Sequence, residues 1–161
     1  MNVKDYLGEQ GVPFEVLEHR PTYDASRLAQ AVHVSGYEVA KTVLLRADGD
    51  YAHVVAVLPA THRVDLGKVS KALGGSRVEL ATEAELAKHC PDCEIGALPP
   101  FGWKYGMETL VDESLTADEH IVFESNFHCE AIRMTYEDFH RLAQPLVVAF
   151  ARRFHEPVKQ A

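Results

Sequence analysis

The feature that most constrains this chain is a lysine inside an otherwise apolar stretch, residues 37–45. Side chains alternate between the two faces of a β-strand, so Val39, Lys41 and Val43 share one face, and the opposite face is also largely apolar. A segment that is apolar on both faces is typical of a central strand in a sheet. A buried ammonium group costs free energy unless a partner or a bound anion compensates it. The strand pattern alone leaves two interpretations of Lys41 open, a structural cation paired with Glu38 or reaching solvent along its stem, and a functional cation that receives an anion.

The rest of the pattern predicts an α+β fold with a mixed, mainly antiparallel sheet and helices around it. A turn at 47–50 should join the lysine strand to an antiparallel strand over 51–58. Helical spacing, capping residues, glycine and proline predict helices over 3–10, 25–35, 65–73, 82–89, 135–144 and 146–154. Alternating or β-branched runs predict further strands over 14–19, 77–80, 109–111, 121–123 and 131–134.

Length and composition favour one soluble domain over residues 1–161. No apolar run is long enough to span a bilayer, and the N-terminus has no apolar signal-peptide core, so we expect no membrane partner and a cytoplasmic location. The cysteines Cys90, Cys93 and Cys129 are odd in number, which argues against a disulfide framework.

The net charge of −8 argues against a large nucleic-acid interface, because phosphate contacts need a basic surface. No run rich in lysine and arginine is present, and Arg152-Arg153 is the densest basic pair. If the ligand is RNA, we expect the protein to hold only its end.

Two further motifs follow the lysine strand. Residues 93–102 form a loop rich in glycine and proline that contains a Gly-x-x-x-Pro element from Gly96 to Pro100. The second motif comprises residues 123–128 and 130–134, which belong to the hairpin formed by the predicted strands 121–123 and 131–134. His128 lies in the connection between these strands. Together with Lys41, these motifs resemble the YbaK/EbsC family of aminoacyl-tRNA deacylases, which is related to the editing domain inserted in bacterial prolyl-tRNA synthetases. The resemblance covers roughly residues 1–145.

The resemblance implies a barrel-like, mixed sheet with a pocket at its mouth, and hydrolysis of the ester that joins an amino acid to the terminal ribose of tRNA. It places Lys41 as the catalytic residue, which positions the substrate while a ribose hydroxyl assists. The implied partner is the aminoacylated acceptor end of tRNA, acting with or without an aminoacyl-tRNA synthetase. The resemblance implies no cofactor and no metal, and alanine, proline, serine and cysteine esters all fit it.

The resemblance also implies a set of substrate-binding residues, namely Gly96, Pro100, Phe101, Gly102, His128, His19 and Thr22, with Tyr23 as an alternative to Thr22. One motif departs from the family pattern Asn-Ala-Gly-x-His, because this chain has Glu124 at the asparagine position and Phe127 before the histidine. Asn126 can adopt the left-handed backbone that the family's glycine would take. We therefore expect the turn to form and the substrate contacts near Glu124 to differ.

Two other interpretations remain open. Cys90-x-x-Cys93 with the adjacent His89, and His128 with Cys129 and Glu130, offer ligand types that zinc prefers. No second Cys-x-x-Cys completes a structural site, and the histidine motif stands in the wrong order for a zinc deaminase. The other alternative is a non-catalytic module that binds an aminoacyl group or an amino acid in the same pocket.

Overall fold

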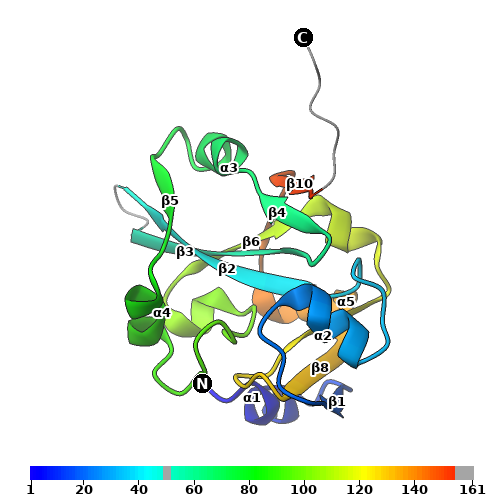
Figure 1. Ribbon diagram of the computed structural model, residues 1–161. Helices are drawn as coiled ribbons and strands as arrows, with labels where there is room; N and C mark the ends of the chain where they lie inside the picture. The colour runs from blue at the N-terminus through cyan, green and yellow to red at the C-terminus, as the bar shows by residue number, and fades with distance from the viewer. Residues whose placement is uncertain (49–51, 155–161) are drawn as a thin grey trace.

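The computed structural model describes residues 1–48 and 52–154, and its centre is a five-stranded sheet (Figure 1). The order of its strands is β5-β2-β3-β6-β9. The strand bounds are Val78–Leu80 for β5, Ala40–Ala47 for β2, Ala52–Pro59 for β3, Glu108–Asp112 for β6 and Leu146–Val148 for β9. β2 is antiparallel to both of its neighbours, whereas β3, β6 and β9 run parallel to one another. The prediction that the lysine strand is central and pairs with the next strand is confirmed, and Lys41 lies opposite Leu58. The turn predicted at 47–50 falls partly outside the described residues.

Two smaller antiparallel sheets complete the β-structure. One has the order β1-β8-β7, with bounds Glu15–Glu18, Glu130–Thr135 and His120–Glu124. The other pairs β4 (His62–Val64) with β10 (Ala151–Arg153). A single parallel bridge between Val39 and Val122 links the lysine strand to β7. The mixed α+β class is confirmed, although within the described residues the strands form three sheets rather than one closed barrel.

Within residues 1–48 and 52–154, five α-helices and two short 3-10 helices pack around these sheets. Their bounds are Val3–Gln10 for α1, Ala25–Ala31 for α2, Leu66–Ala72 for α3, Glu83–His89 for α4, Tyr136–Ala143 for α5, Gly102–Tyr105 for η2 and Glu113–Ala117 for η3. Each α-helix begins after a residue whose side chain accepts a hydrogen bond from the first turn, and these residues are Asn2, Asp24, Asp65, Thr82 and Thr135. None of the helices within the described ranges is long and apolar enough to cross a bilayer.

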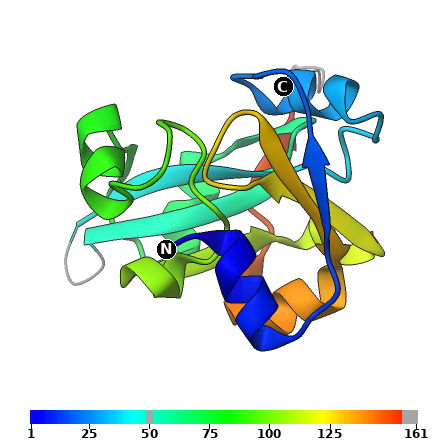
Figure 2. The same ribbon diagram turned by 90° about the horizontal axis from the view of Figure 1, so that it is seen from below.

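The largest core cluster joins α1, α5 and the two main sheets. Seen from below, α1 and α5 lie together against the strands (Figure 2). Phe101, Phe123 and Phe139 are fully buried there and meet edge to face or at a tilt, with ring centroids 5.5–6.5 Å apart. This rigid aromatic centre supports β7 and the loop before η2, and both of these segments border the candidate site.

The helix predicted over 146–154 is wrong, because this segment forms β9 and β10. β9 pairs with β6 and β10 pairs with β4, so backbone pairing with strands distant in sequence overrides the local apolar pattern. Asp112 fixes the bend between the two strands. Its Oδ1 accepts hydrogen bonds from the backbone N–H groups of Phe150 and Ala151, both at 2.9 Å.

Candidate functional site

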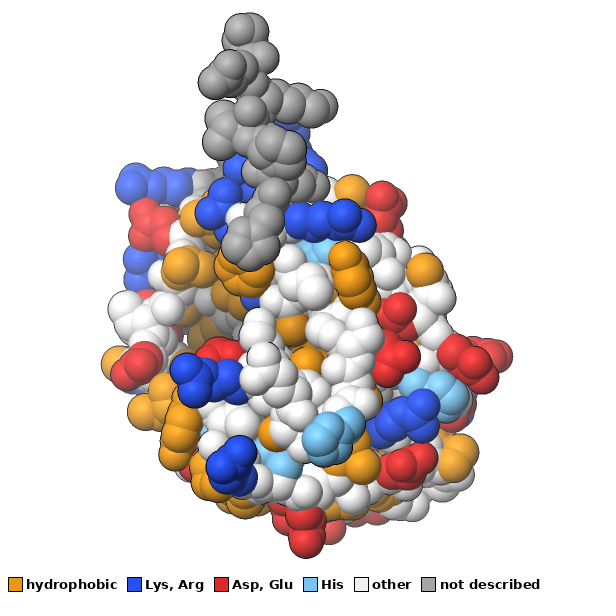
Figure 3. All heavy atoms as spheres, turned by 45° about the vertical axis from the view of Figure 1, so that its right-hand side comes forward, with side chains coloured by type: hydrophobic (Ala, Val, Ile, Leu, Met, Phe, Trp, Pro, Cys, Tyr) orange, Lys and Arg blue, Asp and Glu red, His pale blue; other side chains and the backbone are white. Residues whose placement is uncertain are grey.

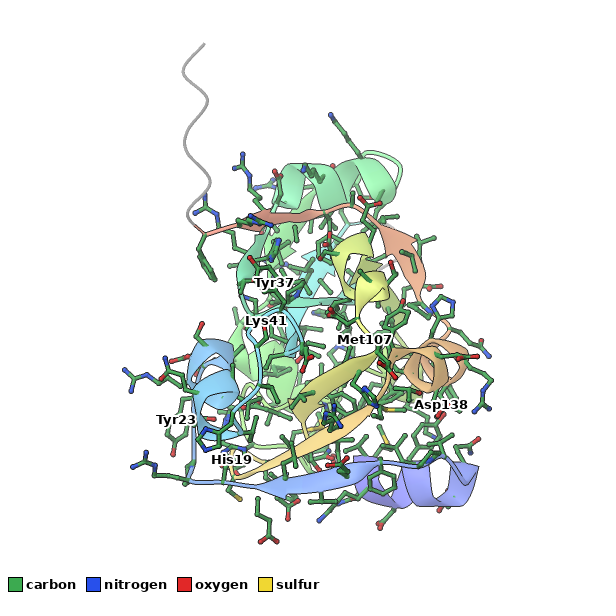
Figure 4. All side chains as sticks on the ribbon, turned by 90° about the vertical axis from the view of Figure 1, so that its right-hand side faces the viewer. His19, Tyr23, Tyr37, Lys41, Met107 and Asp138 are labelled. Carbon is green, nitrogen blue, oxygen red and sulfur yellow. A yellow bond between two sulfur atoms is a disulfide. The ribbon has the colours of Figure 1, made fainter. Side chains whose placement is uncertain are left out.

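Lys41 lines a cavity of about 250 Å³ between α2 and the start of β2. In the side view of Figure 4, Lys41 lies beside α2, and Tyr23 lies below it near the edge of the molecule. The other lining residues come from the segment before α2, from α2, from the 93–102 loop and from the end of β7. They are Tyr23, Asp24, Ala25, Leu28, Val39, Ala40, Thr42, Gly96, Leu98 and Glu124. The cavity is at the lower end of the volumes found for ligand sites, which suits a small ligand.

The Lys41 ammonium group is partly buried and forms no ion pair within residues 1–48 and 52–154. Burial lowers the pKa of Lys41, and the negative charge of Asp24 partly opposes this effect. Its Nζ lies 4.6 Å from the centre of the Phe154 ring, a cation–π contact. The pairing with Glu38 that the sequence left open is not formed. The site therefore holds a cation whose charge the protein leaves largely uncompensated.

Glu124 and His128 form a buried pair of ionisable side chains beside the Lys41 cavity. Nδ1 of His128 and Oε1 of Glu124 are 3.2 Å apart, and both side chains are at least 85% buried, with 7% and 15% of their surface exposed. Burial raises the pKa of Glu124 to about 7, although the nearby imidazole opposes the shift. Burial alone would lower the pKa of His128, but the Ile95 carbonyl and Glu124 outweigh it and raise that pKa.

His128 is held by protein groups at both ring nitrogens. Its Nε2 lies 2.6 Å from the carbonyl oxygen of Ile95, and its backbone N–H donates to Oε1 of Glu94 at 3.2 Å. The ring therefore ties the hairpin to the 93–102 loop. It lines an open groove next to the Lys41 cavity rather than the cavity itself. This geometry favours a positioning role for His128, because protein groups already contact both of its ring nitrogens.

Gly96 brings the loop to the cavity. Its φ of +87° lies in a region that residues with a side chain rarely adopt. A Cβ built there would make an ordinary van der Waals contact with Cε1 of His128, at 3.6 Å, so the backbone conformation is the constraint. The hydroxyl of Thr42 donates to the carbonyl oxygen of Leu98 at 2.7 Å and holds this loop against β2.

The later residues of the same loop lie elsewhere. Phe101 is fully buried in the aromatic core. Gly102 is buried against β6, and a Cβ on it would lie 2.6 Å from Oγ1 of Thr109. Pro100 is buried and is not among the lining residues of the cavity. The structure thus places Pro100, Phe101 and Gly102 as packing residues behind the loop, because the chain turns inward after Leu98.

His19 and Thr22 lie beside the hairpin and are not among the lining residues of the cavity. The backbone N–H of Thr22 donates to the carbonyl oxygen of His128 at 3.0 Å, and that of His19 donates to the carbonyl oxygen of Cys129 at 2.9 Å. The next two residues, Tyr23 and Asp24, do line the cavity. The tyrosine ring is 76% exposed and lies 4.9 Å from the His128 ring. The sequence pattern did not predict Asp24 as a cavity residue. The only role that its sequence position indicates is that of an N-cap for α2.

Asn126 adopts the left-handed conformation expected of it, with φ of +67°. Its Oδ1 accepts from the backbone N–H of Val3 at 3.0 Å, and its Nδ2 donates to the carbonyl oxygen of Met1 at 2.8 Å. The turn between β7 and β8 is therefore anchored to the N-terminus. Phe127 is half-buried and is not among the residues that line the cavity.

The structure joins Cys90 and Cys93 in a disulfide, contrary to the expectation from the odd cysteine count. A backbone hydrogen bond from Cys93 to Cys90 at 3.1 Å closes a turn that brings their Cα atoms to 5.4 Å, within the usual range for a disulfide. Cys90, Asp92 and Cys93 are the only group of potential metal ligands found close together in the described part of the chain. His128, Cys129 and Glu130 do not join it.

The comparisons with known proteins agree with this geometry. The family model described as the aminoacyl-tRNA editing domain matches residues 19–142. A Ser/Thr-tRNA deacylase of Escherichia coli K12, named ProXp-y and described as multifunctional, is 27% identical over 149 residues, which cover 91% of this chain and 89% of that protein. The prolyl-tRNA editing protein ProX of Acetoanaerobium sticklandii is 21% identical over 142 residues and 86% of each chain. The crystal structure of a candidate trans-editing enzyme for prolyl-tRNA synthetase superposes with a TM-score of 0.76 and 22% identity, covering 86% of this chain and 87% of the other.

Proposed function

This chain belongs to the aminoacyl-tRNA editing domain family, and from this premise we propose that it hydrolyses the ester bond of mischarged aminoacyl-tRNA. The observation that carries the proposal is the partly buried Lys41 ammonium, which faces a small cavity without an ion-pair partner in the described chain. The fold places this cation next to Gly96, whose loop leaves room for a ligand close to the backbone.

In this proposal water is the nucleophile, and the ester carbonyl lies near Lys41. The ammonium stabilises the oxyanion of the tetrahedral intermediate, which is the kind of contribution that accounts for about 10²–10³-fold in rate elsewhere. The bond between the carbonyl carbon and the ribose oxygen then breaks, and the ribose oxygen takes up the proton that the attacking water has released, so the products are the free amino acid and a ribose hydroxyl. The neighbouring ribose hydroxyl assists by orienting the water. No serine, cysteine or histidine is among the residues described around the cavity, and the Thr42 hydroxyl donates to the carbonyl oxygen of Leu98, so we propose direct attack by water rather than a covalent intermediate.

The lining also supports a class of amino acid. The cavity is small, and it carries two carboxylates, Asp24 and Glu124, beside the hydroxyl of Thr42. An aminoacyl ester carries an α-ammonium group, which either carboxylate can receive. A short side chain with a hydroxyl group fits the remaining space better than a large apolar one. We therefore propose serine and threonine esters as substrates, the class named for the Escherichia coli relative.

Tyr23 completes the proposed site at its mouth. An exposed aromatic ring next to the cavity provides a surface on which the terminal base of tRNA can stack. Such stacking would place the terminal ribose over the cavity and would not depend on the identity of the tRNA.

The direct test is a deacylation panel with purified protein and tRNAs charged with serine, threonine, alanine, cysteine and proline. We expect hydrolysis of the serine and threonine esters by the wild type and its loss in Lys41→Ala. Tight binding of an aminoacyl-tRNA without turnover would instead support the non-catalytic binding module. Turnover that persists in Lys41→Ala would contradict the role of the lysine and leave the deacylase activity intact.

A further inference from the structure

We propose that the two-stranded ribbon of β4 and β10, which carries Arg63, Arg152 and Arg153, binds the phosphate backbone of the tRNA acceptor stem. This inference rests on the proposed function, because it names how the same site receives a substrate far larger than its cavity. The three residues are exposed and occupy neighbouring positions on the ribbon. They stand out in a protein with a net charge of −8.

Two of these arginines lie opposite each other on the ribbon. Arg63 and Arg152 are direct cross-strand partners, and like charges in this arrangement destabilise a sheet. Arg152 is partly compensated, because its Nε lies 3.3 Å from Oδ2 of Asp65. Arg63 forms no ion pair with any other residue that the structure describes. A polyanion bound across the ribbon would attract both guanidinium groups and so offset the repulsion between them.

The ribbon is continuous with the candidate site. The backbone N–H of Phe154 donates to the carbonyl oxygen of Thr61 at 3.3 Å and extends the pairing of β10 by one residue. The Phe154 ring is the one that contacts Nζ of Lys41, with 4.6 Å to its centroid. The guanidinium carbon of Arg153 lies 5.8 Å from the centre of the Tyr37 ring, and Tyr37 precedes β2 by only three residues. Figure 4 shows Tyr37 and Lys41 close together below the ribbon.

The charge distribution over the surface favours one approach for an RNA. In the space-filling view, lysine and arginine side chains gather at the top of the molecule, where β4 and β10 lie, and acidic side chains are more frequent lower on the same face (Figure 3). A tRNA whose terminal ribose enters the Lys41 cavity would therefore be attracted toward the ribbon. Because the ribbon is short, we expect it to contact only two or three phosphates, which gives a modest affinity with a clear dependence on salt.

The experiment compares two substrates that share the scissile ester. One is seryl-tRNA, and the other is a seryl ester of adenosine, which lacks the acceptor stem. The variants are Arg63→Glu and Arg153→Glu, with Arg63→Lys as the variant that keeps the charge. Arg141→Glu makes the same charge change on α5, away from the ribbon, and serves as the matched control.

We expect each charge reversal on the ribbon to raise KM for seryl-tRNA about tenfold at moderate salt. The negative slope of log(kcat/KM) against log[salt] should become shallower by about one, because one phosphate contact is lost. Hydrolysis of the adenosine ester, and of both substrates by the Arg63→Lys and Arg141→Glu variants, should stay near the wild-type rate. Unchanged KM for seryl-tRNA would overturn the inference, and so would an equal loss with both substrates. Failure of the wild type to hydrolyse either ester would instead contradict the proposed function.

Discussion

Nδ1 of His128 lies 3.2 Å from Oε1 of Glu124, and of the two residues Glu124 lines the Lys41 cavity while His128 lines the neighbouring groove. Because Nε2 of the same ring faces the Ile95 carbonyl, the imidazole donates at both nitrogens only when it is protonated. Against the effect of burial, these two contacts raise the pKa of His128 and hold its ring against Glu124. It is Glu124, at the position where the family pattern has an asparagine, that faces the cavity.

The first prediction concerns binding at Glu124. Its pKa is raised to about 7, so the carboxyl group is neutral at lower pH and becomes a counter-charge for the substrate ammonium as the pH rises through 7. We expect KM for seryl-tRNA to fall with rising pH between about 6 and 8 in the wild type. In Glu124→Gln this dependence should disappear, and KM should stay near the low-pH value of the wild type. A variant that keeps the pH dependence would show that another group titrates.

A second prediction concerns stability and the same residue. Because the folded pKa of Glu124 lies above the ordinary value of 4.5, the folded state binds the proton more tightly than the unfolded chain. The associated stability is present below pH 4.5 and is lost as the pH rises toward 7. Glu124→Gln removes this loss. The urea midpoint of the variant minus that of the wild type should therefore increase between about pH 5 and pH 8. An opposite trend would contradict the direction of the shift.

Lys41 should show a trade-off between stability and activity. Burial lowers its pKa, so the charged form is disfavoured in the folded protein. Lys41→Met keeps the length of the side chain and removes the charge, and we expect it to raise the urea midpoint while lowering kcat at least 100-fold. Lys68→Met, a similar change at an exposed lysine on α3, is the control and should alter neither quantity appreciably.

Tyr23 should contribute through its ring and not through its hydroxyl. Stacking of a base on an aromatic side chain contributes about 1–3 kcal/mol, so Tyr23→Ala should raise KM for aminoacyl-tRNA roughly 5-fold or more. Tyr23→Phe keeps the ring and should behave like the wild type. Equal effects of the two substitutions on steady-state kinetics would argue for a role of the hydroxyl group instead.

The two glycines of the 93–102 loop should separate function from packing. Gly96→Ala forces a side chain onto a residue with φ of +87°, and we expect about 1–2 kcal/mol of destabilisation together with a loss of kcat/KM. Gly102→Ala would place a Cβ 2.6 Å from Oγ1 of Thr109 and 3.0 Å from the carbonyl oxygen of Met107. It should destabilise the fold more strongly, yet leave KM unchanged in the folded fraction. Denaturant titration and initial rates distinguish the two.

The sequence by itself determined the local structure and the central cation. Capping side chains such as Asp65 and Thr82 act within one helical turn, so their positions could be read directly. Alternation along β2 identified Lys41 as an unusual charge in a central strand, because that pattern depends only on neighbouring residues. The left-handed backbone at Asn126 is expected from the resemblance, which places the family's glycine at this position.

Only the tertiary structure decided which residues face the cavity and which support it. Phe101 and Gly96 are five residues apart in one loop, yet one packs in the aromatic core and the other borders the cavity. The sequence predicts an apolar helix over residues 146–154. Pairing of β10 with β4 instead forms a two-stranded ribbon that carries exposed arginines. Glu124 borders the Lys41 cavity because a parallel bridge at Val39 brings β7 to the lysine strand. Asp24 reaches the same cavity from the N-terminus of α2. These contacts join residues far apart in the chain, and their free energy depends on packing and strand pairing that no local pattern contains.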